Sequence, residues 1–171
     1  KRQLRRGEIP DADAPLEHGT EVNLREPALI PEDYLPDINS RLVLYKRIAA
    51  AEDEEELRNL QVEMIDRFGL LPQQASNLFV VSGLRLKAQA LGIRTIEAGA
   101  EGGSIVFNES TPVDPLALVQ LVQSDPRQYK LSGADRLRFD TGLPDIQLRV
   151  RHIEGLLESL STDPQKSTAD A

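Results

Sequence analysis

The apolar residues of this chain change their spacing partway along it, and this change limits the folds that the chain can adopt. Between residues 38 and 91 they recur every three or four positions, which is the period of amphipathic helices. Between residues 93 and 139 short runs alternate apolar and polar residues, and Gly-containing links separate them. A link of this kind favours a β-hairpin, whose strands are antiparallel. The spacing therefore predicts helices clustered in the first half, followed by hairpins.

The order of the predicted elements defines a fold class. A short strand around Val22 and Leu24 comes first. The elements expected after it are helices over 38–51, 53–68 and 72–91, a hairpin over 93–98 and 104–108, a helix over 114–124, a hairpin over 129–131 and 137–139, and a helix over 144–160. Because the helices do not alternate with every strand, we predict a single α+β domain. Its small, mostly antiparallel sheet, two hairpins plus an N-terminal strand, packs with about five helices.

The helical patterns also predict which side chains face the core. In the first helix the expected apolar face consists of Ile38, Leu42, Tyr45, Ile48 and Ala49. The third helix is apolar on more than one face, so we expect it to be central. Its Gly83 costs roughly 1 kcal/mol relative to alanine, and we expect a close helix or strand crossing to compensate.

The two ends of the chain lack the patterns of a folded core. Residues 1–20 are predicted to be a linker, because Gly7, Pro10 and Pro15 interrupt a polar stretch. Residues 162–171 are predicted to be a disordered tail. The folded domain is expected over residues 21–161. A chain of 171 residues, 40% of them hydrophobic, can build a core without a metal or disulfide.

Composition excludes several classes of function. The chain has no Cys, so thiol catalysis, disulfides and thiolate metal sites are excluded. It has no run near the ~20 apolar residues of a membrane span, and a cytoplasmic location is expected. The net charge is −8, and four of the cations lie in the first six residues. Nucleic-acid binding by this chain is therefore not expected, and a partner with a basic surface suits its charge better.

Motifs for catalysis are missing from the sequence. Its two histidines are His18, in the predicted linker, and His152, which lies beside Arg149 and Arg151 on the final predicted helix and is expected on a solvated face. The Gly-rich link at residues 99–103 leads into a strand, whereas a phosphate loop leads into a helix. Neither a Gly-x-Ser-x-Gly nor a His-Glu-x-x-His motif occurs. We predict a non-catalytic interaction domain with no cofactor and no metal.

One group of charged residues on the second predicted helix is more specific. Glu63, Asp66 and Arg67 are spaced i, i+3 and i+4, so they share one helical face. Their neighbours Met64, Ile65 and Phe68 are expected to point largely into the core. A Glu63–Arg67 pair on ordinary solvated surface explains the spacing, and so does a contact site for a partner. Spacing alone favours ordinary surface.

Several segments together resemble the C-terminal domain of bacterial transcription-repair coupling factors. They are Arg41-Leu42, Tyr45-Lys46-Arg47-Ile48-Ala49, Asp66-Arg67-Phe68-Gly69-Leu70-Leu71-Pro72 and Leu91-Gly92-Ile93. The resemblance runs from about Glu21 to Ser161, in matching order and spacing. No single motif is catalytic, so the specificity lies in the set.

The resemblance implies a role within a larger protein. The parent proteins of this family are ATP- and Mg-dependent translocases on duplex DNA, which displace stalled RNA polymerase and recruit UvrA for excision repair. Their C-terminal domain takes no part in the ATP chemistry. It folds back on the N-terminal UvrB-like module and masks the UvrA-binding surface, which is autoinhibition. By the same resemblance, Lys1–Gly7 ends the translocase part.

The resemblance also assigns a contact site. Glu63, Asp66 and Arg67 match the positions with which the family's domain contacts the UvrB-like module. The domain thereby competes indirectly with UvrA. The alternative is a recruiting module that contacts RNA polymerase or another repair factor directly. Low Lys and Arg density argues against DNA as its partner, but not against a protein.

Overall fold

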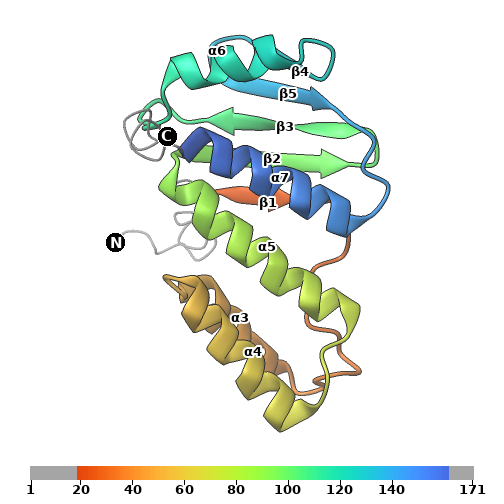
Figure 1. Cartoon of the computed structure of the whole chain (residues 1–171). Coiled ribbons are helices and arrows are strands. Elements are labelled where there is room, and N and C mark those ends of the chain that lie inside the picture. Colours follow the sequence, from red (N-terminus) through yellow and green to blue (C-terminus); the bar gives the residue numbers. More distant parts are fainter. Residues whose placement is uncertain (1–18, 162–171) are drawn as a thin grey trace, which may run out of the picture.

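A five-stranded sheet and two groups of helices form the part of the computed structural model that is described, residues 19–161 (Figure 1). The elements are β1 (Glu21–Asn23), α3 (Ile38–Ala50), α4 (Glu54–Phe68), α5 (Gln73–Ala90), β2 (Ile93–Gly99), β3 (Gly102–Phe107), α6 (Pro115–Ser124), β4 (Tyr129–Ser132), β5 (Arg136–Asp140) and α7 (Ile146–Ser161). The predicted α+β class is confirmed. The predicted linker, apart from residues 19 and 20, and the predicted tail lie outside the described residues, so the domain bounds stay a prediction.

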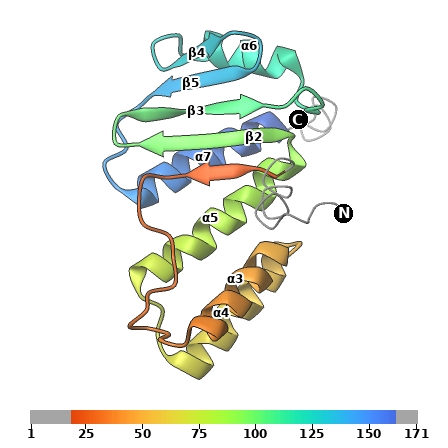
Figure 2. The same ribbon diagram turned by 180° about the vertical axis from the view of Figure 1, so that it is seen from behind.

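The sheet has the strand order β1-β2-β3-β5-β4. Strands β2 and β3 form one hairpin, β4 and β5 form the other, and β3 joins the two hairpins by antiparallel pairing with β5. The edge strand β1 is parallel to β2. Helices α5 and α7 lie on one face of the sheet, and the opposite face is open in the view from behind (Figure 2).

The glycines of the first hairpin are required by close backbone approach. Gly102 has a φ of 135°, and a Cβ atom there would collide with the Phe139 carbonyl of the neighbouring strand. A Cβ atom on Gly103 would collide with the Glu97 carbonyl across the hairpin. The hairpin is confirmed, but these glycines, which belong to the predicted link at residues 99–103, lie in the paired strand β3, so the turn is shorter than expected.

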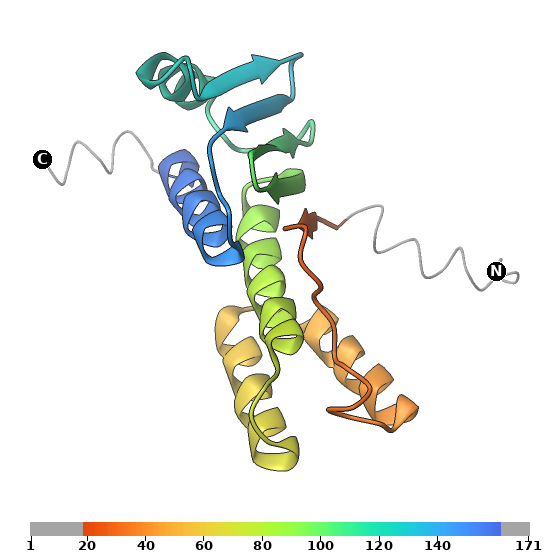
Figure 3. The same cartoon turned by 90° about the vertical axis from the view of Figure 1, so that its right-hand side faces the viewer.

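Helix α5 lies between two hydrophobic cores (Figure 3). Leu84 and Ala88 pack into the sheet core, which also contains Ile96, Ile105, Leu137, Phe139, Ile153 and Leu157. Phe79 packs into the helical core, which also contains Ile30, Leu44, Ile48, Leu57, Leu60 and Met64. The predicted central position of this helix is confirmed, because apolar stripes on two faces need two packing partners.

Two of the packing expectations are wrong. In α3 the buried residues are Leu44 and Ile48, whereas Ile38 is 61% exposed and Leu42 is 53% exposed. Leu42, Val43 and Leu44 are consecutive, so the period alone does not determine which of them meets the helical core. Gly83 has no close crossing either, because a Cβ atom there would meet nothing within 4 Å.

Arg149 is buried, although a solvated face was expected next to it. Only 4% of the residue is exposed. Its Nε donates to the Leu143 carbonyl at 2.9 Å and its Nη1 to the Leu24 carbonyl at 2.8 Å, and Glu26 lies 3.5 Å away. One guanidinium thus ties the end of β1 to the start of α7, because buried carbonyls need donors.

His152 is also half-buried, against expectation. Its ring stacks on Tyr129 with centroids 6.1 Å apart and lies 5.0 Å from the Phe139 ring. Nε2 is buried and has no hydrogen-bond partner among residues 19–161. Burial lowers the pKa of His152, so the ring is neutral at pH 7 and packs as an aromatic side chain.

We expect Arg149→Met to destabilise the domain by about 3 kcal/mol, because it leaves several buried carbonyls without donors. Urea unfolding followed by circular dichroism measures this loss. The exposed neighbour supplies a matched control, Arg151→Met, which should change stability by less than about 0.5 kcal/mol. Equal effects of the two substitutions would contradict the role of Arg149.

His152 predicts a pH dependence of stability. Because its pKa is lower in the folded state, the unfolded chain binds this proton more readily. The contribution of neutral His152 to the free energy of unfolding should be fully present above the ordinary histidine pKa of about 6.5. It should be lost as the pH falls through and below that value. We expect His152→Phe to reduce the fall in urea midpoint between about pH 7.5 and 5.5. An unchanged fall in the variant would show that another group titrates.

Candidate functional site

Helix α4 has a firmly fixed start, so its exposed face has a defined direction. The Asp53 side chain accepts from the Glu56 N–H at 2.8 Å, and Glu56 Oε1 accepts from the Glu52 N–H at 2.8 Å. This arrangement resembles a capping box, except that Glu56 accepts from the N–H one residue before the N-cap Asp53. It accounts for the acidic run at residues 52–56 without a ligand. Leu57, Leu60 and Met64 bury the opposite face.

Glu63 lies at the centre of the predicted site and joins two helices. Arg67 Nη1, one turn later on α4, is 3.2 Å from Glu63 Oε2. Arg47, from the last turn of α3, donates Nη1 to Oε2 at 2.8 Å and Nη2 to Oε1 at 2.9 Å. A bidentate pair of this kind fixes the relative orientation of both side chains. The Arg47–Glu63 bridge therefore links α3 to α4.

Sequence reasoning missed Arg47 as a site residue. Residues 47 and 63 belong to different helices, so no helical spacing rule connects them. The available signals are that Arg47 lies within a segment that carries the family resemblance, and that it is the basic residue of the last turn of α3. Neither signal specifies its partner before the helices pack.

The electrostatics of the bridge favour the charged states of both partners. Hydrogen bonds from Arg47 lower the pKa of Glu63, and Arg67 adds to this effect. The same hydrogen bond raises the pKa of Arg47. The side chains of Glu63, Arg47 and Arg67 remain 34%, 45% and 55% exposed, so solvent screens these pairs. A partner can therefore reach them.

An aromatic pair supports Arg67. Its guanidinium carbon lies 4.8 Å from the centroid of the half-buried Phe68 ring, within cation–π range. The centroids of the Tyr34 and Phe68 rings are 6.2 Å apart, and the two rings pack in a T-shaped arrangement. The Tyr34 hydroxyl donates to the Gly69 carbonyl at 2.8 Å. Met64 is buried as predicted, but Ile65 is 38% exposed and not in the core.

Asp66 differs from its two neighbours. The residue is exposed, and no ion pair or hydrogen bond within residues 19–161 uses its carboxylate. The structure therefore brings Glu63 and Arg67 together and leaves Asp66 beside them on its own. We call Arg47, Glu63, Asp66 and Arg67 the α3–α4 cluster. Its one unpaired charge is negative.

Two hollows and an apolar rim border the α3–α4 cluster. One hollow of about 190 Å³ is lined by Asn39, Ser40, Val43, Leu44, Arg47, Arg67 and Phe68. Another of about 370 Å³ is lined by Arg47, Ala50, Glu56, Asn59, Leu60 and Glu63. Val43 beside the first hollow is 55% exposed. Mixed charge next to apolar side chains is the composition of a protein-binding surface.

Other classes of site find little support in the part of the chain that the structure describes. Residues 19–161 contain no group of three or more His, Asp or Glu placed to hold a metal ion. The same residues contain no helix long and apolar enough to cross a membrane. The α3–α4 cluster contains the three residues of the contact site that the family resemblance implies, Glu63, Asp66 and Arg67.

Comparisons with known proteins agree with the resemblance seen in the sequence. The family model of the TRCF domain matches residues 24–118. The transcription-repair-coupling factor of Escherichia coli (strain K12) is 43% identical over 157 residues, which cover 92% of this chain and 14% of that protein. Those of Haemophilus influenzae and Myxococcus xanthus are 40% and 30% identical, over 92% and 79% of this chain.

A solved structure shows the same fold. It is the crystal structure of the C-terminal domain of a transcription-repair coupling factor, with a TM-score of 0.69 and 21% identity over 83% of this chain and 92% of that one. The chain spans about a seventh of the length of the E. coli and H. influenzae relatives, 14% in each case. From the family model and the relatives together, the chain belongs to the transcription-repair coupling factor family and carries its TRCF domain.

Proposed function

We propose that this chain is the non-catalytic regulatory domain of a transcription-repair coupling factor in transcription-coupled nucleotide excision repair. In this proposal the domain folds back on the UvrB-like N-terminal module through the α3–α4 cluster and masks the surface that binds UvrA. ATP, Mg, duplex DNA and RNA polymerase belong to the rest of such a protein, which acts in the cytoplasm. The observation that carries the proposal is Asp66, which has no ion-pair partner within residues 19–161, beside a preformed Arg47–Glu63–Arg67 arrangement.

The geometry suits a partner with mixed charge. Asp66 can accept hydrogen bonds from an Arg or Lys of the partner, and Arg67 has donors left for a carboxylate because only its Nη1 contacts Glu63. Contacts with Glu63 and the Phe68 ring hold the Arg67 side chain in place, so less conformational entropy is lost when Arg67 binds a partner. The apolar rim at Val43 adds area that can be buried.

The expected strength of the contact between the two domains suits a reversible switch between a closed and an open state. Partly exposed charge pairs contribute about 1 kcal/mol each at most. A flexible tether between domains of one chain supplies an effective concentration on the order of millimolar, so a modest contact suffices for closure. A partner that binds only the open state can then shift the equilibrium.

The structure separates two variants that look equivalent in the sequence. Glu63→Arg breaks the bridge between α3 and α4 as well as the proposed interface, so its effects are mixed. Asp66→Arg changes an exposed side chain with no partner in the described residues, so it acts on the interface alone. The exchange Arg47→Glu with Glu63→Arg keeps an oppositely charged pair between the helices and inverts its polarity toward a partner. It also replaces the Glu63–Arg67 pair by two arginines one turn apart, so its stability is measured as well.

We expect Asp66→Arg in the full-length coupling factor to raise UvrA affinity about tenfold, toward that of a form lacking residues 21–161. The Arg47–Glu63 exchange should act in the same direction. Biolayer interferometry with immobilised UvrA measures the affinities, and thermal unfolding of the isolated chain verifies folding. Glu109→Arg is the matched control, because it makes the same charge change on an exposed loop residue.

Two results would contradict the proposal in different ways. If only the truncated form binds UvrA more tightly, masking takes place through another surface of the domain. If truncation too leaves UvrA affinity unchanged, the domain is not autoinhibitory, and a module that recruits RNA polymerase or another repair factor becomes the better account.

A further inference from the structure

Figure 2 shows the face of the sheet that no helix of residues 19–161 covers. Strand register places one residue from each strand side by side across it: Asn23, Glu97, Ser104, Arg138 and Lys130. The next row contains Thr95, Val106, Arg136 and Ser132. Apart from Ser132, whose neighbour Leu131 is 43% exposed, each of these residues has a strand neighbour in the sheet core, so its side chain points away from α5 and α7.

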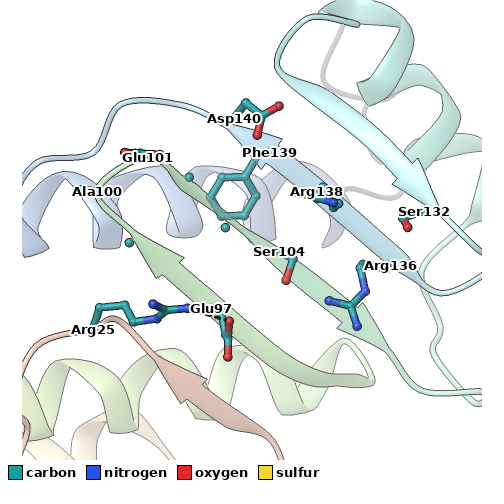
Figure 4. Close-up of a pocket in the computed structure, with 13 residues that line it drawn as sticks. Arg25, Glu97, Ala100, Glu101, Ser104, Ser132, Arg136, Arg138, Phe139 and Asp140 are labelled. Carbon is teal, nitrogen blue, oxygen red and sulfur yellow. Dashed lines mark hydrogen bonds and ion pairs between the residues drawn. The ribbon is translucent and has the colours of Figure 1, made fainter.

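A groove of about 740 Å³ runs along this face (Figure 4). Several of its lining residues have small side chains or none: Gly99, Gly102, Gly103 and Ser104. Arg25 and Glu97 lie on one side of it, and Arg136 and Arg138 lie on the other. Backbone is thus accessible between two charged walls. We call this the sheet groove.

The two walls of the sheet groove differ in how their charges are balanced. Arg25 is paired with Glu97 at 3.3 Å. Within residues 19–161, no ion pair includes Arg136, Arg138 or Lys130. Arg138 and Lys130 are direct cross-strand partners on the same face, and like charges in that relation destabilise a sheet. An anion at this wall would relieve the repulsion, in a molecule whose net charge is −8.

We propose that the sheet groove binds an extended acidic segment of a partner protein, whose carboxylates contact Arg136, Arg138 and Lys130. Arg136 and Arg138 are two positions apart on one strand face, about 7 Å along the strand. An extended segment repeats its own side chains at the same interval, so alternate acidic residues match both arginines. The inference concerns a different surface from the α3–α4 cluster and does not depend on it.

A protein segment fits this groove better than a nucleic acid does. Glu97, Glu101 and Asp140 also line the groove, and they would repel a backbone that carries a charge at every nucleotide. A peptide can place carboxylates opposite the arginines and neutral residues elsewhere. The one aromatic residue of the lining, Phe139, is 1% exposed, so it offers no platform for stacking a base.

The test uses the whole 171-residue chain and a fluorescein-labelled peptide that alternates glycine and glutamate. Fluorescence anisotropy at moderate salt should detect binding, and Arg136→Glu with Arg138→Glu should weaken it at least about tenfold. Ser104→Phe fills the groove without changing charge and should weaken binding about threefold or more. The control Arg127→Glu with Arg151→Glu makes the same charge change at exposed positions outside the lining and should stay within about twofold.

Any one of the following results would overturn the proposal. No binding of the peptide at millimolar concentration, or equal binding by the arginine double variant and the wild type, would show that the groove is not an acidic-segment site. Tighter binding of a thymidine oligonucleotide of equal charge would assign the face to nucleic acid. A dimer in sedimentation analysis that the double variant abolishes would assign it to a second copy of the chain.

Discussion

Helix α5 is the element on which the rest of the structure depends, because it contributes to both hydrophobic cores. Leu84 and Ala88 pack under the sheet, and Phe79 packs against α3 and α4. A helix with a single apolar stripe could join only one of these groups. Since α5 is continuous over Gln73–Ala90, the pair α3–α4 is held to the sheet by packing, and not merely by a tether. The α3–α4 cluster is therefore presented on a firm support.

Local signals in the sequence were sufficient for the elements and their ends. Asp53 and Glu56 predict the start of α4 because capping involves neighbours within one turn. The Gly-rich stretch at residues 99–103 marks the hairpin because the link between two adjacent strands depends on neighbouring residues. The α+β class follows from the order of such elements, and the family resemblance names the same domain.

Pairings between distant residues were not accessible from the sequence. Arg149 carries a charge that is normally solvated, yet its partner Leu24 lies 125 positions away, and only the fold brings the two together. The partner of Glu63 comes from another helix, so spacing identified Arg67 and not Arg47. The wrong face predicted for α3 has the same cause, since three consecutive apolar residues fit more than one helical stripe. The sequence thus predicted which helical face carries the candidate site, but not which side chains pair within it.

The bridge between Arg47 and Glu63 gives the α3–α4 cluster two roles. It stabilises the packing of two helices, and it orients charges that a partner can meet. The sheet groove, by contrast, has charges that no contact within residues 19–161 balances. The two surfaces consequently differ in how binding would affect them. The charged pairs of the α3–α4 cluster are in place before a partner binds, whereas an anion bound in the sheet groove would relieve repulsion between like charges.

Site-specific photo-crosslinking in the full-length coupling factor tests most directly whether the α3–α4 face contacts the UvrB-like module. Val43 beside the cluster and Leu116 on α6 are 55% and 56% exposed, so a benzoylphenylalanine at either position is equally accessible. Our account predicts that irradiation links position 43 to the UvrB-like module and that saturating UvrA suppresses this product, whereas position 116 gives no such link. Crosslinks from position 116 alone, or equal crosslinking from both positions, would contradict it.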